Sequence, residues 1–159
     1  MKSLLTFIFV SILSFSSIAQ NTLTSNKYKI AFETTELLEQ YETEAETVLG
    51  YENNNYAVDI EIFSVDEQPQ SFIDSQKQGA VNTAKSLGLK EATFGERVNK
   101  IPGAYYALAY EIYESERNPV YVIAALNKKL GITYEATVYC YSKHLEEGKK
   151  IAKSFRLLD

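Results

Sequence analysis

Alternation of apolar and polar side chains is the feature that most limits how this chain can fold. Residues 55–65 place apolar side chains at even positions and carboxylates between them: Tyr56, Val58, Ile60 and Ile62 against Asp59 and Glu61. A period of two is typical of a strand with one buried face. Residues 43–51 are predicted to pair with this strand through a turn at Asn53-Asn54-Asn55, because asparagine tolerates the left-handed backbone of tight turns. The two segments are therefore expected to form a hairpin.

The rest of the chain combines further strand patterns with two helical ones. One helix is predicted from Pro69 to Leu87, and another from Leu145 to Leu157, since apolar residues recur there at three-to-four spacing. Further strands are predicted at residues 27–33, 89–97, 105–113, 120–126 and 132–141, with turn residues such as Pro102-Gly103 and Asn118-Pro119 before them. The chain is therefore expected to be α+β, with an antiparallel sheet of about six or seven strands flanked by two main helices.

The N-terminus has the pattern of an export signal. A basic start precedes an apolar run over residues 4–18, and Ser17 and Ala19 supply the small residues of a cleavage site. The run is too short and too rich in serine for a membrane anchor. We therefore expect residues 1–19 to be a signal peptide and residues 20–159 to be a single domain. The protein is expected to be periplasmic or secreted, with no stable membrane anchor after cleavage.

Residue counts exclude several kinds of chemistry. The single cysteine, Cys140, and the single histidine, His144, allow no intrachain disulfide and no histidine-based metal site. We interpret Cys140, inside a predicted strand, as a small buried residue rather than a nucleophile, and His144 as a surface residue. No Gly-x-Gly pair occurs, so no nucleotide cofactor is expected, and no metal either. A formal net charge of −5, or −6 without Lys2, disfavours nucleic acid as a partner.

Acidic residues are concentrated in one part of the chain. Residues 30–76 contain twelve Asp or Glu and not one Lys or Arg, whereas residues 77–159 are mildly basic. One interpretation is an acidic surface that meets a basic partner or weakly collects divalent cations. The plainer interpretation, which we favour, is a solvated surface that keeps an exported protein soluble.

Tyrosine is abundant, with twelve residues and no tryptophan. In the predicted strands, four tyrosines are separated from a glutamate of the same strand by an even number of residues and should lie with it on the more polar face of the sheet. They are Tyr105, Tyr113, Tyr139 and Tyr141, with the glutamates Glu111 and Glu135. Tyrosine provides contact area at low entropic cost, which makes these residues the best candidates for a binding site. The alternative is cross-strand pairing, or cover beneath a helix.

Several local sequences resemble the PsbP-like fold family, including its small secreted bacterial members. They are the opening strand Tyr28-Lys29-Ile30-Ala31-Phe32, the strand and helix between Phe63 and Gly88, Ile101-Pro102-Gly103-Ala104-Tyr105-Tyr106 before a strand, and Ile151-Ala152-Lys153-Ser154-Phe155-Arg156 at the end. The resemblance implies an antiparallel sheet flanked by helices, in an accessory or binding protein with no shared enzyme chemistry. It implies no site residues, and a fold by itself does not fix a function.

Together these patterns predict an exported, non-catalytic binding or accessory protein of the cell envelope. Its partner is expected to be another envelope protein, held by the tyrosine-bearing face or by the acidic half. The alternative is a carrier of a small apolar or aromatic ligand between sheet and helix. An enzyme ranks third, because Asp59 and Glu61, on a solvent-facing side of a strand, are not expected to have raised pKa values. The sequence leaves the partner's identity and the oligomeric state open.

Overall fold

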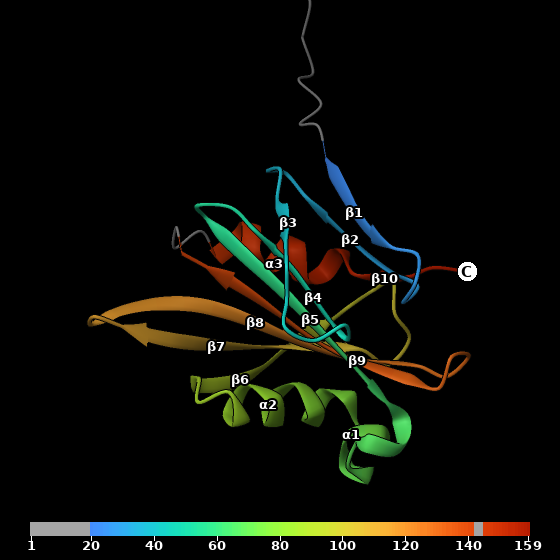
Figure 1. The fold of residues 1–159 in the computed structure, drawn as a ribbon. Coiled ribbons are helices and arrows are strands. Elements are labelled where there is room, and N and C mark those ends of the chain that lie inside the picture. Colours follow the sequence, from blue (N-terminus) through green and yellow to red (C-terminus); the bar gives the residue numbers. More distant parts are fainter. Residues whose placement is uncertain (1–19, 142–144) are drawn as a thin grey trace, which may run out of the picture.

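The computed structural model describes residues 20–141 and 145–159, which form three layers (Figure 1). A seven-stranded sheet lies in the middle, with a small sheet and helix α3 on one side and helices α1 and α2 on the other. The predicted class, α+β with an antiparallel sheet and two main helices, is confirmed. The predicted signal peptide, residues 1–19, and His144 lie outside the described residues. Within the described ranges, no helix is long and apolar enough to cross a membrane.

The large sheet is antiparallel throughout, in the order β3-β4-β5-β9-β8-β7-β6. Its strands are β3 (Glu39–Tyr41), β4 (Val48–Glu52), β5 (Tyr56–Ser64), β6 (Lys90–Arg97), β7 (Tyr105–Tyr113), β8 (Glu116–Asn127) and β9 (Ile132–Cys140). The predicted hairpin is confirmed as the β4–β5 pair, although its first strand begins at Val48 rather than at residue 43. Asn53 shapes its turn, because its Oδ1 accepts hydrogen bonds from the backbone N–H groups of Asn55 and Tyr56 at 2.8 and 2.9 Å.

The main core lies between the large sheet and the layer formed by the small sheet and α3. The small sheet consists of β1 (Asn21–Ser25), β2 (Ile30–Thr34) and β10 (Arg156–Leu157), and α3 spans Leu145–Ser154. In the core, the rings of Phe32 and Phe155 stack with their centroids 5.0 Å apart. Tyr134 is almost fully buried there and donates its hydroxyl to the backbone oxygen of Tyr28 at 2.5 Å. These contacts join both ends of the chain to the central sheet.

Two predicted boundaries at the ends of the chain are wrong. The first strand was predicted at residues 27–33, but residues 26–29 form the turn between β1 and β2, where Lys29 has a φ of 55°. The last helix was predicted to reach Leu157, but α3 ends at Ser154. The chain leaves the helix there because Arg156 pairs with Ala31 in the small sheet.

The helix predicted over residues 69–87 is in fact two helices, α1 (Gln70–Asp74) and α2 (Gln76–Ser86). Ser75 separates them with an extended backbone, at φ −150° and ψ 96°. Its hydroxyl caps α2 by accepting a hydrogen bond from the Gln78 N–H. The apolar spacing continues across this break, which is why the sequence pattern indicated a single helix.

The predicted turn at Asn118-Pro119 is also wrong, since both residues lie within β8. The turn between β7 and β8 is formed by Glu114 and Ser115, whose φ values are 46° and 69°. Positive φ at both residues of a short loop matches the twist of the flanking strands. Pro119 is tolerated in the strand because pairing of β8 with β9 begins only at Val120.

Helix α2 covers only part of the second face of the large sheet (Figure 1). It contacts β6, β7 and β8, and the contact is lined by small residues that are fully buried: Ala80, Ala84, Ala107 and Ala124. On the same face, β3, β4, β5 and β9 carry side chains that reach solvent. This uncovered part of the face is where tyrosines and carboxylates gather.

Candidate functional site

The register of the sheet brings tyrosines and carboxylates together on the face that α2 leaves open. Asp59 on β5 lies opposite Gly50 on β4, which in turn lies opposite Tyr41 on β3. In the next row, Glu61 on β5 lies opposite Glu135 on β9. We define the tyrosine-carboxylate face as the partly exposed residues of these and the adjoining rows: Tyr41, Glu52, Asp59, Glu61, Glu111, Glu135, Tyr139 and Tyr141.

Tyr41 reaches Asp59 by lying across a glycine. Its hydroxyl donates a hydrogen bond to the Asp59 carboxylate from two strands away. A Cβ on Gly50 would overlap the Tyr41 ring, so the ring fills the space above this position. Burial, the hydrogen bond to Asp59 and the Asp59 charge together raise the pKa of the Tyr41 hydroxyl well above its usual value. The pair therefore holds a proton firmly on the tyrosine.

The carboxylates of β5 have raised pKa values, which corrects the expectation for Asp59 and Glu61. Burial raises the pKa of Asp59, and the hydrogen bond from Tyr41 opposes part of this rise. Burial also raises the pKa of Glu61, and the charges of Glu135 and Asp59 raise it further. The expectation failed because β5 is an interior strand, and side chains of the neighbouring strands displace water from the same face.

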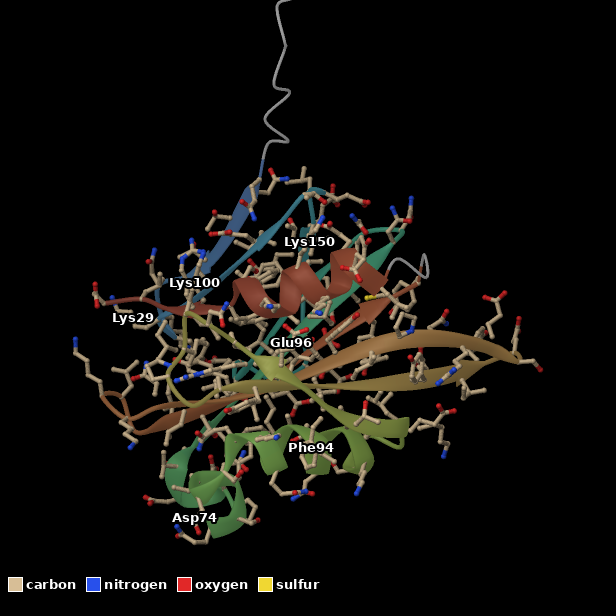
Figure 2. The ribbon with its side chains drawn as sticks, turned by 180° about the vertical axis from the view of Figure 1, so that it is seen from behind. Lys29, Asp74, Phe94, Glu96, Lys100 and Lys150 are labelled. Atoms are coloured by element: carbon tan, nitrogen blue, oxygen red, sulfur yellow. The ribbon has the colours of Figure 1, made fainter. Side chains whose placement is uncertain are left out.

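No ion pair neutralises the tyrosine-carboxylate face within residues 20–141 and 145–159. Acids on the α3 side of the molecule are paired with bases instead. Hydrogen bonds from Lys149 and Lys153 lower the pKa of Glu96 to about 2, and Lys100 lies 3.3 Å from the Glu33 carboxylate. Figure 2 shows Glu96 and Lys100 near α3. Within the part of the chain that the structure describes, the carboxylates of the open face thus lack the basic partners that Glu33 and Glu96 have.

Tyr139 and Tyr141 lie side by side at the end of β9. Their rings are inclined by 14°, with centroids 6.4 Å apart. Tyr139 is half-buried against the core beneath α2, and burial, with the charge of Asp59, raises the pKa of its hydroxyl to about 12. Tyr141 is 45% exposed. Partial burial raises the pKa of its hydroxyl, and three neighbouring carboxylates raise it further: Glu111, Asp59 and Glu52.

Asn118 is a buried polar residue beside Glu111 of the face. It is 7% exposed and lies opposite Glu111 in the β7–β8 pair. Val120, two residues further along β8, lies opposite Tyr139, where the pairing of β8 with β9 begins. The Asn118 Oδ1 is buried and has no hydrogen-bond partner among the residues that the structure describes. A buried acceptor without a donor is costly, and burial closes this oxygen to donors in the solvent.

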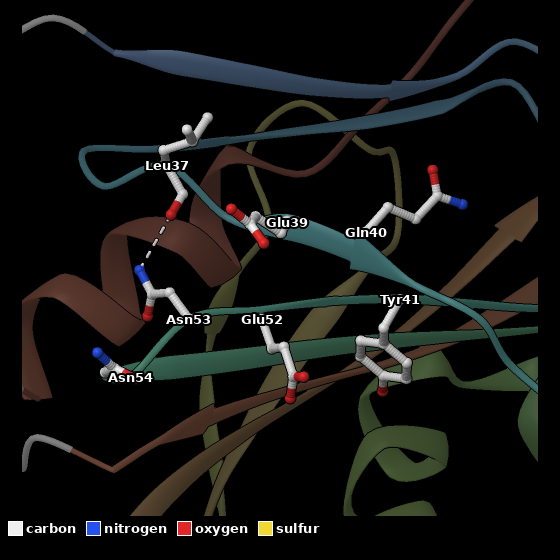
Figure 3. Close-up of a pocket in the computed structure, with 7 residues that line it drawn as sticks. All are labelled: Leu37, Glu39, Gln40, Tyr41, Glu52, Asn53 and Asn54. Atoms are coloured by element: carbon white, nitrogen blue, oxygen red, sulfur yellow. Dashed lines mark hydrogen bonds between the residues drawn. The ribbon is translucent and has the colours of Figure 1, made fainter.

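A pocket of about 520 Å³ continues the face at the sheet edge, between β3 and the β4–β5 turn (Figure 3). Its lining residues are Leu37, Glu39, Gln40, Tyr41, Glu52, Asn53 and Asn54. Asn53 closes one side by donating its Nδ2 to the Leu37 backbone oxygen at 3.1 Å, the bond dashed in the figure. Glu39 and Glu52 lie opposite each other in the β3–β4 pair. The pocket therefore extends the acidic character of the face.

Of the predicted site residues, four lie in the open part of the face: Glu111, Glu135, Tyr139 and Tyr141. Tyr105 shares the face but lies beside α2, with the Lys77 ammonium 5.7 Å from its ring centroid, which matches the alternative of cover beneath a helix. Tyr113 is 63% exposed at the margin, next to the β7–β8 turn. Glu135 accepts a hydrogen bond from Gln68 at 2.8 Å and is thus partly engaged.

Sequence reasoning missed Tyr41, Glu52 and Asn118 as members of this site. Asn118 was interpreted as a turn residue, and the three residues of β3 are too few to show a strand pattern. One signal was available in Gly50, because a glycine inside a predicted strand indicates the close approach of another group. It could not have shown that the group is Tyr41.

The described residues place the Cys140 thiol in the core of the fold. Cys140 is fully buried in β9, as predicted, and burial raises the pKa of its thiol to about 12. A Cβ on Gly148 of α3 would overlap the Cys140 sulfur, so helix and thiol are in close contact. Across residues 20–141 and 145–159, no three His, Cys, Asp or Glu side chains are grouped to hold a metal ion.

A cavity of about 230 Å³ lies where the predicted ligand carrier would hold its cargo, between the α1–α2 segment and β9. Phe72, Gly79, Thr83 and Glu135 are among the residues that line it. Pockets for small organic ligands usually have volumes of about 300 to 1,000 Å³. The space between helix and sheet is thus small for such a ligand.

Comparison with known proteins reveals similarity of fold. Neither known protein families nor curated proteins match by sequence. The Ran-binding protein Mog1p of Saccharomyces cerevisiae has a similar structure, with a TM-score of 0.59 and 10% identity over 90% of this chain and 97% of Mog1p. A point mutant of Mog1 gives a TM-score of 0.56 and 8% identity over 89% of this chain and 97% of that one.

A protein from Bacteroides thetaiotaomicron is also similar, with a TM-score of 0.55 and 10% identity over 87% of this chain. This chain covers 48% of that protein, or about half its length. At such identities the similarity shows the fold alone. Membership of the PsbP-like family therefore stays a prediction.

Proposed function

We propose that this protein is a non-catalytic binding protein that holds another protein on its tyrosine-carboxylate face. One observation carries the proposal: the part of the sheet face that α2 leaves open presents tyrosines among carboxylates that have no ion-pair partner within the described residues. Tyrosines combine an apolar ring with a polar end and are enriched where proteins bind each other. Interior strands also supply a rigid platform, so little conformational entropy is lost on binding.

The partner is proposed to be another protein of the cell envelope. This part of the proposal rests on the export pattern of residues 1–19 in the sequence. Mog1p, which shares the fold, is a Ran-binding protein, so at least one protein of this shape binds another protein. That precedent supports a binding role and says nothing about the identity of the partner, because one fold serves many functions.

Site-specific photocrosslinking tests this proposal directly. A photoreactive phenylalanine analogue is placed at position 141 of the full chain, at position 113, and at position 150 on α3 as the control. We expect one protein to crosslink to position 141, the same protein to crosslink to position 113 in lower yield, and no crosslink to form at position 150. The partner is then purified, and its affinity for wild type and for Tyr141→Ala is compared.

Loss of affinity in Tyr141→Ala, with an unchanged unfolding temperature, supports the assigned face. Tyr141 suits this test better than Tyr139, because it is 45% exposed whereas Tyr139 packs on the core beneath α2. Crosslinking of the same protein from position 150 alone, or full affinity in Tyr141→Ala, would overturn the proposal.

The second candidate is a carrier of a small apolar or aromatic ligand, which would lie in the 230 Å³ cavity beside Phe72 and Glu135. It predicts a ligand that co-purifies with the chain and raises its unfolding temperature. Native mass spectrometry of the purified protein separates the two candidates. Detection of the bare chain mass alone would count against the carrier and leave the protein-binding proposal standing.

A further inference from the structure

The charge of the tyrosine-carboxylate face differs from that of the rest of the molecule. Five carboxylates lie on it, at Glu52, Asp59, Glu61, Glu111 and Glu135, without a lysine or arginine among the residues of the face. The opposed pair Glu61 and Glu135 repel each other, which raises the pKa of Glu61. This repulsion is relieved when a positive charge binds, so the face is complementary to a cation.

Tyr141 is the accessible centre of this negative region. The residue is 45% exposed, and the charges of three carboxylates raise the pKa of its hydroxyl: Glu111, Asp59 and Glu52. A cation above such a ring is attracted by the ring face and by the surrounding charges together. Tyr139 beside it, with its ring inclined by only 14°, extends the aromatic surface.

We infer that the partner binds through a cationic segment, and that the guanidinium of one of its arginines stacks on Tyr141 between Glu111 and Glu52. Arginine fits better than lysine, because its guanidinium is planar, stacks on aromatic rings and carries five donors in a fixed fork. The acidic pocket of about 520 Å³ at the β3 edge is placed to take a second basic side chain of the same segment. This inference rests on the proposed function and names the chemistry of the partner.

A set of matched peptides tests the inference. The probe is a dye-labelled Gly-Ser peptide that carries three arginines, and its controls carry citrulline, which has the same shape without the charge, or lysine. Protein is purified from cells expressing the full chain, and binding is followed by fluorescence anisotropy. We expect the citrulline peptide to bind at least about tenfold more weakly than the arginine peptide, and the lysine peptide to bind with an affinity between the two. Equal binding of the arginine and citrulline peptides would overturn the inference.

Variants of the protein locate the bound arginine. Tyr141→Ala and Glu111→Gln should each weaken binding of the arginine peptide by about tenfold. Glu44→Gln is the matched control, because it removes the same charge from an exposed residue outside the face. An equal loss of affinity in Glu44→Gln would show that the overall negative charge of the protein causes the binding. It would contradict the assigned place.

The crosslinked partner separates failure of this inference from failure of the proposed function. If Tyr141→Ala loses the partner and Glu111→Gln and Glu52→Gln retain it fully, the binding face stands and the cationic contact is wrong. If Tyr141→Ala retains the partner, the proposed function itself fails. Loss in all three variants, with the partner retained by Glu44→Gln, supports both.

Discussion

The ring of Tyr41 lies directly over Gly50, in the space that a side chain at position 50 would occupy. This arrangement lets an edge-strand tyrosine cross β4 and bond Asp59 on β5. An aromatic ring that covers a glycine in this way also shields the exposed backbone of the strand. The pair therefore joins the edge of the sheet to the centre of the candidate site.

Replacing Gly50 by alanine is expected to displace the Tyr41 ring and break its hydrogen bond to Asp59. Overpacking of this kind usually lowers the free energy of unfolding by about 1 to 3 kcal/mol. Urea unfolding of Gly50→Ala checks the stability. A spectrophotometric titration of tyrosine should also show one hydroxyl whose pKa falls, because Tyr41 loses the burial and the carboxylate that raise it.

A double variant provides the control for that prediction. In a Tyr41→Ala background the ring is absent, so Gly50→Ala should lower the free energy of unfolding only slightly. A cost that is the same in both backgrounds would show that the glycine is needed for another reason.

Glu61→Gln is expected to stabilise the protein at neutral pH. The folded-state pKa of Glu61 is raised above 4.5, so its ionisation is less favourable in the folded state, and stability falls as pH rises through the raised pKa. Removing the charge opposite Glu135 should therefore increase the free energy of unfolding by about 0.5 kcal/mol at pH 7. At pH 3 the gain should vanish, because Glu61 is then protonated in both states. Urea unfolding at both pH values tests this, and a gain that persists at pH 3 would contradict it.

Ser75→Ala is expected to weaken the start of α2. The Ser75 hydroxyl accepts the Gln78 N–H, and loss of such a cap costs about 1 kcal/mol of stability. Chemical denaturation measures the loss, with Ser71→Ala on the exposed surface of α1 as the control. Equal losses in the two variants would mean that the cap contributes nothing specific.

The thiol of Cys140 should be unreactive in the native protein. It is fully buried, and burial raises its pKa to about 12, so little thiolate exists at pH 8 and reagents cannot reach it. We expect its labelling by an aromatic disulfide to be slower than in urea by at least about a thousandfold, with the rate limited by opening of the fold. Rapid labelling of the native chain would disprove the burial.

Local sequence patterns were enough to predict most of the sheet but not the site. The alternation in β5, β7 and β9 identified the strands and their faces, because the period of two is local. The site instead depends on which strands lie side by side. Tyr41 meets Asp59 only through the β3-β4-β5 order, and strand order is a non-local property.

The position of α2 could not be predicted from the sequence pattern either. Tyr105 and Tyr141 share one parity, yet α2 lies beside the first and leaves the second exposed, since its alanines fit against β7 and β8. The break at Ser75 was hidden for a related reason. A serine can cap a helix or lie within one, and apolar spacing does not distinguish the two.

The shortness of β3 bears on how copies of this chain meet one another. An edge strand exposes unpaired backbone groups that can recruit a strand from a second molecule and start aggregation. Here the edge has only three residues, and exposed acids follow it at Glu42, Glu44 and Glu46. At the other edge, β6 pairs with irregular register. Acids of the acidic stretch therefore serve different places: Glu52, Asp59 and Glu61 lie on the open face, available to a cation, whereas Glu42, Glu44 and Glu46 lie beside the edge, where their charge disfavours extension of the sheet.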